Sequence, residues 1–124
     1  MASLTIMNSV YKHWNPEEVR GELTTAKARG KWDEVLKILS ETNPKIYRDG
    51  LFDFEFEDLK HLLVMTDQLE EERLALTTAN LLMDKAESNL SLIKGLGDWA
   101  LGFIKSISVV QVILYRINKI RGNI

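Results

Sequence analysis

Two histidines, His13 and His61, are the residues whose chemistry would be easiest to recognise in this sequence. Asp58 precedes His61 by three residues, so on a helix a carboxylate and an imidazole would lie one turn apart, as in a di-iron helical bundle. Such a bundle needs a second pair of this kind and two further helical carboxylates, and the sequence has no second histidine motif. We therefore expect Asp58 and His61 to form an exposed pair on a helix surface, with no metal site.

Sequence patterns for other kinds of catalysis are also missing. No serine lies in a nucleophile elbow, and neither histidine lies in a turn motif. Gly95-Leu96-Gly97 follows no strand pattern and lacks the lysine of a phosphate-binding loop. The acidic string from Asp53 to Asp58 contains bulky aromatic residues and lacks the glycine of a calcium loop. The sequence therefore predicts no catalytic residue, no cofactor and no small-molecule substrate.

The composition is typical of one folded domain. Of the 124 residues, 45% are hydrophobic and 27% are charged, which is too apolar for a disordered chain. A net charge of −2 gives no overall reason to expect nucleic-acid binding. The absence of cysteine excludes disulfides and suits a reducing compartment. Met1 to Asn8 carry no basic region and no long apolar run, which predicts no secretory signal peptide.

Charge is unevenly distributed along the chain. Between Asp53 and Glu72 there are eight acidic residues and one lysine, whereas the segment from Trp99 onward has four basic residues and no acidic one. Two interpretations stay open. The charges form two solvated faces, or the basic end meets an acidic partner. That partner would be the acidic stretch of a neighbouring copy or a lipid headgroup.

The first part of the chain predicts an extended arm over residues 1–14, followed by a helical hairpin over residues 15–50. Asn15 is a preferred N-cap, Pro16 suits the first helical position, and Glu18 stands where a capping-box acid reaches back. Gly30 is expected to end the first helix in a left-handed conformation. The second helix is expected to end before Asn43-Pro44, with a connector after it.

The segment Ala28–Leu36 combines a small residue, a glycine, an aromatic residue and an acidic pair. In this it resembles the turn of a tetratricopeptide-like hairpin, which implies two antiparallel helices. The resemblance covers one hairpin, and we find no second copy at the family's period of about 34 residues. Because such arrays need at least about three repeats to bury their faces, we interpret the match as shared turn chemistry.

Residues 51–95 predict a long coiled-coil-like helix. The alternating Phe52, Phe54 and Phe56 lead into it. They form either a strand paired with the N-terminal arm or, the interpretation that we favour, an extended segment whose phenylalanines pin the hairpin onto the next helix. From Glu57 to Lys94 there is no Gly or Pro. Apolar residues recur there in alternating steps of three and four, which is a heptad pattern. We expect this oligomer seam to consist of Leu62, Met65, Leu69, Leu76, Ala79, Met83, Ala86, Leu90 and Ile93.

Residues 96–124 predict an apolar, basic C-terminal helix. It is apolar on more than one face, so it must be covered by protein or lipid. A lysine near its middle, Lys105, would cost roughly 2.5–3.5 kcal/mol in a bilayer, so we favour protein. The residues expected to pack against protein or membrane are Trp99, Phe103, Ile107, Val110, Ile113, Leu114 and Ile117.

These patterns together predict an all-α protein: an N-terminal hairpin, a long seam helix and an apolar C-terminal helix in one domain. The expected function is non-enzymatic assembly into a helical homo-oligomer, by analogy as a component of a virus or phage particle. Other protein subunits are alternative partners. We expect the protein in the cytoplasm or within a macromolecular particle. The alternative function is that of a membrane-active or tail-anchored protein that inserts its C-terminal helix.

Overall fold

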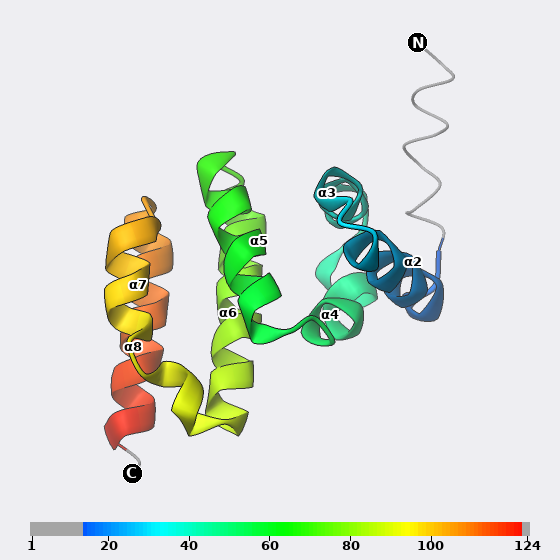
Figure 1. Cartoon of the computed structure of the whole chain (residues 1–124). Helices are drawn as coiled ribbons and strands as arrows, with labels where there is room; N and C mark the ends of the chain where they lie inside the picture. Colours follow the sequence, from blue (N-terminus) through cyan, green and yellow to red (C-terminus); the bar gives the residue numbers. More distant parts are fainter. Residues whose placement is uncertain (1–13, 123–124) are drawn as a thin grey trace. The chain divides into compact units, whose positions relative to one another are not determined.

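The computed structural model describes residues 14–122, in which all regular secondary structure is helical (Figure 1). The predicted all-α fold class is thus confirmed for these residues. The chain divides into two compact units, one ending at Phe54 and the other beginning at Glu55. The predicted arm lies outside the described residues, apart from its last residue, Trp14. The first unit contains α2 (Pro16–Ala28), α3 (Trp32–Glu41) and α4 (Pro44–Phe52). The second unit contains α5 (Phe56–Gln68), α6 (Glu72–Ser88), the 3-10 helix η2 (Leu90–Ile93), α7 (Leu96–Phe103) and α8 (Ile107–Gly122).

Helix α2 begins with the predicted capping box. The Asn15 side chain accepts a hydrogen bond of 2.9 Å from the backbone N–H of Glu18, whose carboxylate accepts one from the N–H of Asn15. These bonds satisfy two of the donors that a helix N-terminus leaves free. The expected helical spacing places Val19 and Leu23 in the core of the first unit.

The predicted connector after Asn43-Pro44 is wrong, because this segment forms a third helix, α4. Asn43 and Pro44 end α3, but they are also residues that favour a helix start. Helix α4 packs closely on α2 at Gly50, where a Cβ atom would lie 2.9 Å from the Cα of Arg20. Beyond it, Asp53 binds the Arg20 guanidinium through two hydrogen bonds, which raise the pKa of Arg20.

The strand or extended segment expected across Phe52–Phe56 is also wrong. Phe52 is the last residue of α4, and Phe56 is the first residue of α5. Phe54, in the turn between them, is buried and contacts Trp32 edge-on, with 6.1 Å between the ring centroids. Phe54 therefore packs on the hairpin of the first unit from a turn and not from an extended segment.

In the second unit, the single helix expected over residues 51–95 is two helices that pack against each other, α5 and α6. The break comes at Glu70, which adopts a left-handed backbone with φ of 59°. The N–H of Glu70 donates to the carbonyl of Asp67 (3.1 Å), and the N–H of Glu71 donates to that of Thr66 (3.0 Å). This is the Schellman pattern that ends many helices, formed here without the usual glycine.

The turn between α2 and α3 has the same geometry, with φ of 69° at Gly30. The N–H of Gly30 donates to Lys27 (3.0 Å) and that of Lys31 to Ala26 (2.9 Å). The second hairpin therefore repeats the first one 40 residues later, counted from Gly30 to Glu70. Equivalent positions are buried in both first helices, namely Val19 and Leu59, Leu23 and Leu63, and Ala26 and Thr66.

The C-terminal helix expected over residues 96–124 is broken as well. Residues Ile104–Ser106 separate α7 from α8. Within the second unit, α5 and α7 run in one direction and α6 and α8 in the other (Figure 1). Gly97 of α7 lies against α8, where its Cβ would be 3.4 Å from Leu114. Helix α8 buries one stripe of side chains, Val109, Ile113, Ile117 and Ile120.

Candidate interaction surface at the turn end of the second unit

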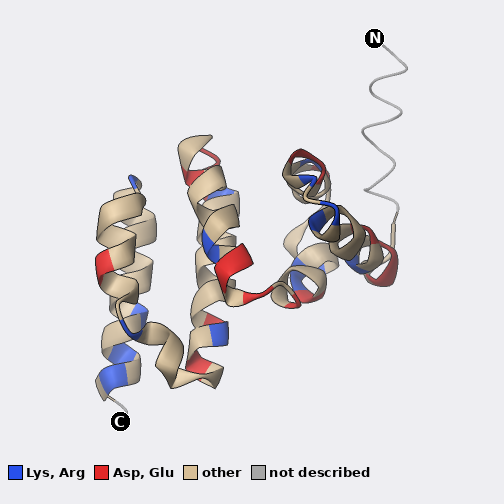
Figure 2. Ribbon diagram, viewed as in Figure 1, with Lys and Arg blue, Asp and Glu red and all other residues tan. Residues whose placement is uncertain are grey.

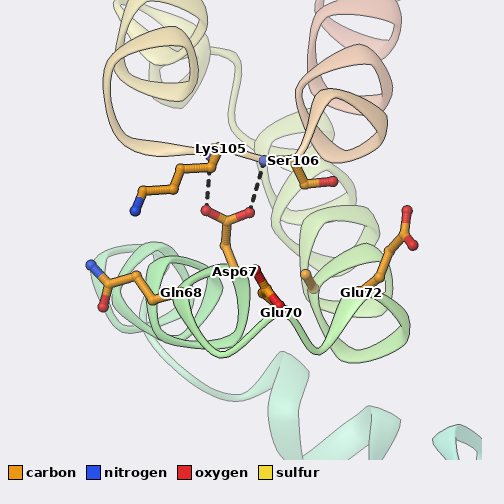
Figure 3. Close-up of a pocket in the computed structure, with 7 residues that line it drawn as sticks. Asp67, Gln68, Glu70, Glu72, Lys105 and Ser106 are labelled. Atoms are coloured by element: carbon orange, nitrogen blue, oxygen red, sulfur yellow. Dashed lines mark hydrogen bonds between the residues drawn. The ribbon is translucent and has the colours of Figure 1, made fainter.

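Asp67 joins the end of α5 to the start of α8. Its carboxylate accepts hydrogen bonds from the backbone N–H groups of Lys105 (2.8 Å) and Ser106 (3.0 Å), as Figure 3 shows. The side chain is buried, and its negative charge lies at the N-terminus of α8, where the helix dipole favours it. The α5–α6 and α7–α8 turns therefore lie at the same end of the unit, which we call the turn end (Leu69–Glu72 and Leu101–Ile107).

A hollow of about 330 Å³ lies beside this junction. Both oxygens of the Asp67 carboxylate already accept backbone hydrogen bonds, so its role in the hollow is to hold the turn. No group of three metal-ligating side chains is found among residues 14–122. The hollow is lined by Asp67, Gln68, Glu70, Glu72, Ala75, Lys105 and Ser106 (Figure 3).

The turn end carries large apolar side chains that remain open to solvent. Their exposed fractions are 59% for Leu69, 63% for Leu101, 62% for Phe103 and 73% for Ile107. Single exposed apolar side chains are common on protein surfaces, whereas several at one end form the kind of patch that marks an interaction site. Lys60 lies over the Trp99 ring, 4.9 Å from its centroid, and Trp99 stacks on Phe103, so Phe103 is held in place on α7.

The predicted seam along one helix is wrong, because its residues belong to separate helices. Those on the facing sides of α5, α6 and η2 are buried inside the unit, namely Leu62, Ala79, Met83, Ala86 and Ile93. Met65 and Leu76 are half-buried. Leu69 and Leu90 are exposed, because each lies where the chain turns out of the α5–α6 pair.

The residues that were predicted to pack in the C-terminal helix also differ in their exposure to solvent. Ile113 and Ile117 are buried, Trp99, Val110 and Leu114 are half-buried, and Phe103 and Ile107 are exposed. The break at Ile104–Ser106 explains the division, because it places Phe103 and Ile107 at the tip of a turn. Sequence reasoning missed Leu101 and Asp67. The contact of Asp67 with Lys105 spans 38 residues and leaves no local signal.

The opposite end of the second unit, where α6 and α8 finish, has the other sign of charge. Its basic residues are Lys94, which follows η2, and Lys119 and Arg121 in the last turn of α8. Together with the exposed Leu90 of η2, we call these residues the tail end. Figure 2 shows basic residues in blue at the lower end of α8 and at the turn that leads into α7. Helix α8 is fixed to α6 above this end by Arg116, which binds Asp84 (2.8 Å), Glu87 (2.9 Å) and the carbonyl of Asn80 (3.0 Å).

Comparison with known proteins gives no further guidance. The chain matches no protein-family model, and neither a curated protein nor a solved structure is similar to it. Of the helices between residues 14 and 122, none is both long and apolar enough to cross a lipid bilayer. The surfaces described above are therefore the basis for a functional proposal.

Proposed function

We propose that this protein is a non-enzymatic assembly protein that forms a homo-oligomer through its turn end. One observation supports this above all: Leu69, Leu101, Phe103 and Ile107 are more than half exposed at one end of one unit. Exposed apolar patches on soluble monomers rarely exceed a few hundred Å² and are often functional. Because the Asp67 hydrogen bonds fix the turn, the patch is a preformed surface, which lowers the entropy cost of binding.

The size of the patch predicts weak association. Full burial of a large apolar side chain contributes about 1.5–3 kcal/mol, so four that start about two-thirds exposed would contribute roughly 4–8 kcal/mol. Association costs about 4–15 kcal/mol in lost translational and rotational freedom. Apolar burial alone therefore leaves little surplus, and polar contacts must supply the rest. We expect an oligomer that dissociates on dilution.

Insertion of the C-terminal helix into a bilayer has less support. Ile113 and Ile117, which would have to enter lipid, already pack inside the second unit. Inserting α8 would also remove Arg116 from Asp84 and Glu87, leaving three charges to be solvated anew. Homo-oligomer formation requires neither change.

Light scattering coupled to size exclusion tests the proposal. The double variant Phe103→Ser/Ile107→Ser should be a monomer at concentrations where the natural protein is an oligomer. Tyr115→Ser is the matched control, because Tyr115 is an aromatic residue of α8 that is 63% exposed but lies away from the turn end. A natural protein that stays monomeric in buffer and binds lipid vesicles would favour the membrane alternative.

A further inference from the structure

The two ends of the second unit carry opposite charges. At the turn end, Glu70, Glu71 and Glu72 follow the exposed Leu69. The tail end has three basic residues and the exposed Leu90. Among the residues that the structure describes, no ion pair engages any of these six charged side chains. The turn end therefore has a net negative charge, because Lys105 offsets only one of the three glutamates. The tail end has a net positive charge, because Glu87 in the last turn of α6 is paired with Arg116.

These charges are too far apart to neutralise each other within one copy. Helix α8 has 16 residues and connects the two ends, which corresponds to a length of about 24 Å at ~1.5 Å per residue. The Debye length at physiological ionic strength is about 8 Å, so attraction across one copy is screened. A second copy has no such limit, because its tail end can approach the turn end directly.

We infer that copies of this protein associate head to tail, the acidic turn end of one copy docking on the basic tail end of the next. This inference rests on the proposed function and specifies its partner surface. Leu69, Phe103 and Ile107 would then lie against Leu90, while Glu70–Glu72 face Lys94, Lys119 and Arg121. The charge pairs provide the polar contacts that the apolar patch alone lacks.

A symmetric contact between two turn ends is the alternative arrangement of two copies. It would place the three glutamates of one copy beside those of its partner, and like charges across an interface oppose association. An anionic lipid surface would be repelled by the same glutamates. A head-to-tail contact is heterologous, so each copy keeps one free end and growth continues into a ring or an open chain.

Complementary charge reversals test this inference. One variant carries Glu70→Lys, Glu71→Lys and Glu72→Lys, and the other carries Lys94→Glu, Lys119→Glu and Arg121→Glu. We expect each variant alone to self-associate at least tenfold more weakly than the natural protein. An equimolar mixture should regain the natural mass, because every contact between the two variants is again acidic on basic. Circular dichroism of each variant checks that the helices are intact.

The outcomes separate this inference from the proposed function. A natural protein that is monomeric at every concentration overturns both. A natural oligomer whose two variants stay monomeric when mixed, with their helices intact, overturns only the head-to-tail arrangement. A natural mass that stops at the dimer also contradicts it, since a heterologous contact does not close with two copies. Two neutral variants, with Gln at Glu70–Glu72 in one and at Lys94, Lys119 and Arg121 in the other, should each associate weakly alone. Their mixture should stop at the dimer, because only the intact turn end of one variant and the intact tail end of the other can pair.

Discussion

Asp67 offers the most direct test of how the turn end is built. Its carboxylate accepts the N–H groups of Lys105 and Ser106 at 2.8 and 3.0 Å and is almost fully buried. Replacement by alanine removes both acceptors and leaves two backbone donors without a partner. Hydrogen bonds to a charged group contribute about 1.5–3 kcal/mol each, and solvent at the exposed Lys105 reduces the loss, so Asp67→Ala should lower the free energy of unfolding by about 2–4 kcal/mol.

Urea unfolding followed by circular dichroism measures this loss. Asp67→Asn retains one acceptor oxygen and should lose about half as much, roughly 1–2 kcal/mol. Gln68→Ala is the matched control on the neighbouring exposed residue, where a change within about 0.5 kcal/mol is expected. If Asp67→Ala is as stable as that control, the Asp67 carboxylate does not hold the α7–α8 turn and the break in the C-terminal helix has another cause.

Three further predictions concern the two hairpins, with denaturant unfolding as the measurement for each. Gly50→Ala should destabilise the first unit by about 1–3 kcal/mol, because its Cβ would clash with the α2 backbone. Gly21→Ala should stabilise the same unit by about 0.5–1 kcal/mol, because Gly21 lies inside α2 with no atom near its Cβ. Glu70→Gly should stabilise the second unit by about 1 kcal/mol because its φ is positive, and Gly30→Ala should destabilise the first unit by a similar amount. A Glu70→Gly variant that is not stabilised, or a Gly30→Ala variant that is not destabilised, would contradict the shared geometry of the two turns. Asn15→Ala should cost about 1 kcal/mol through loss of the capping box, and an unchanged stability would mean that the N-terminus of α2 frays without consequence.

Local signals in the sequence were sufficient for the first helix and its turn. Asn15 and Glu18 interact across three residues, and Gly30 is the residue type that a left-handed backbone favours, so both features can be read from neighbouring positions. Asn43-Pro44 was ambiguous, because the same pair ends one helix and begins the next. The first meaning alone predicts a connector, whereas the structure has α4.

The second unit was harder to predict because its turns depend on tertiary contacts. Glu70 adopts a positive φ although it is not a glycine, so a continuous heptad pattern concealed the break between α5 and α6. At the break between α7 and α8, the Lys105 backbone N–H donates its hydrogen bond to Asp67, which is far away in sequence. Leu69, Phe103 and Ile107 were expected to be covered by packing, and these two breaks are what leave them at the surface.

The central claim, self-association through the turn end, is tested most directly by the mass of the natural protein in solution as a function of concentration. Sedimentation equilibrium should give a mass that rises above that of the 14.2 kDa chain as the concentration increases. Under the same conditions the double variant Phe103→Ser/Ile107→Ser should keep the monomer mass, and Tyr115→Ser should match the natural protein. A natural protein that remains at the monomer mass throughout, or a double variant that associates as well as the natural one, would contradict the account.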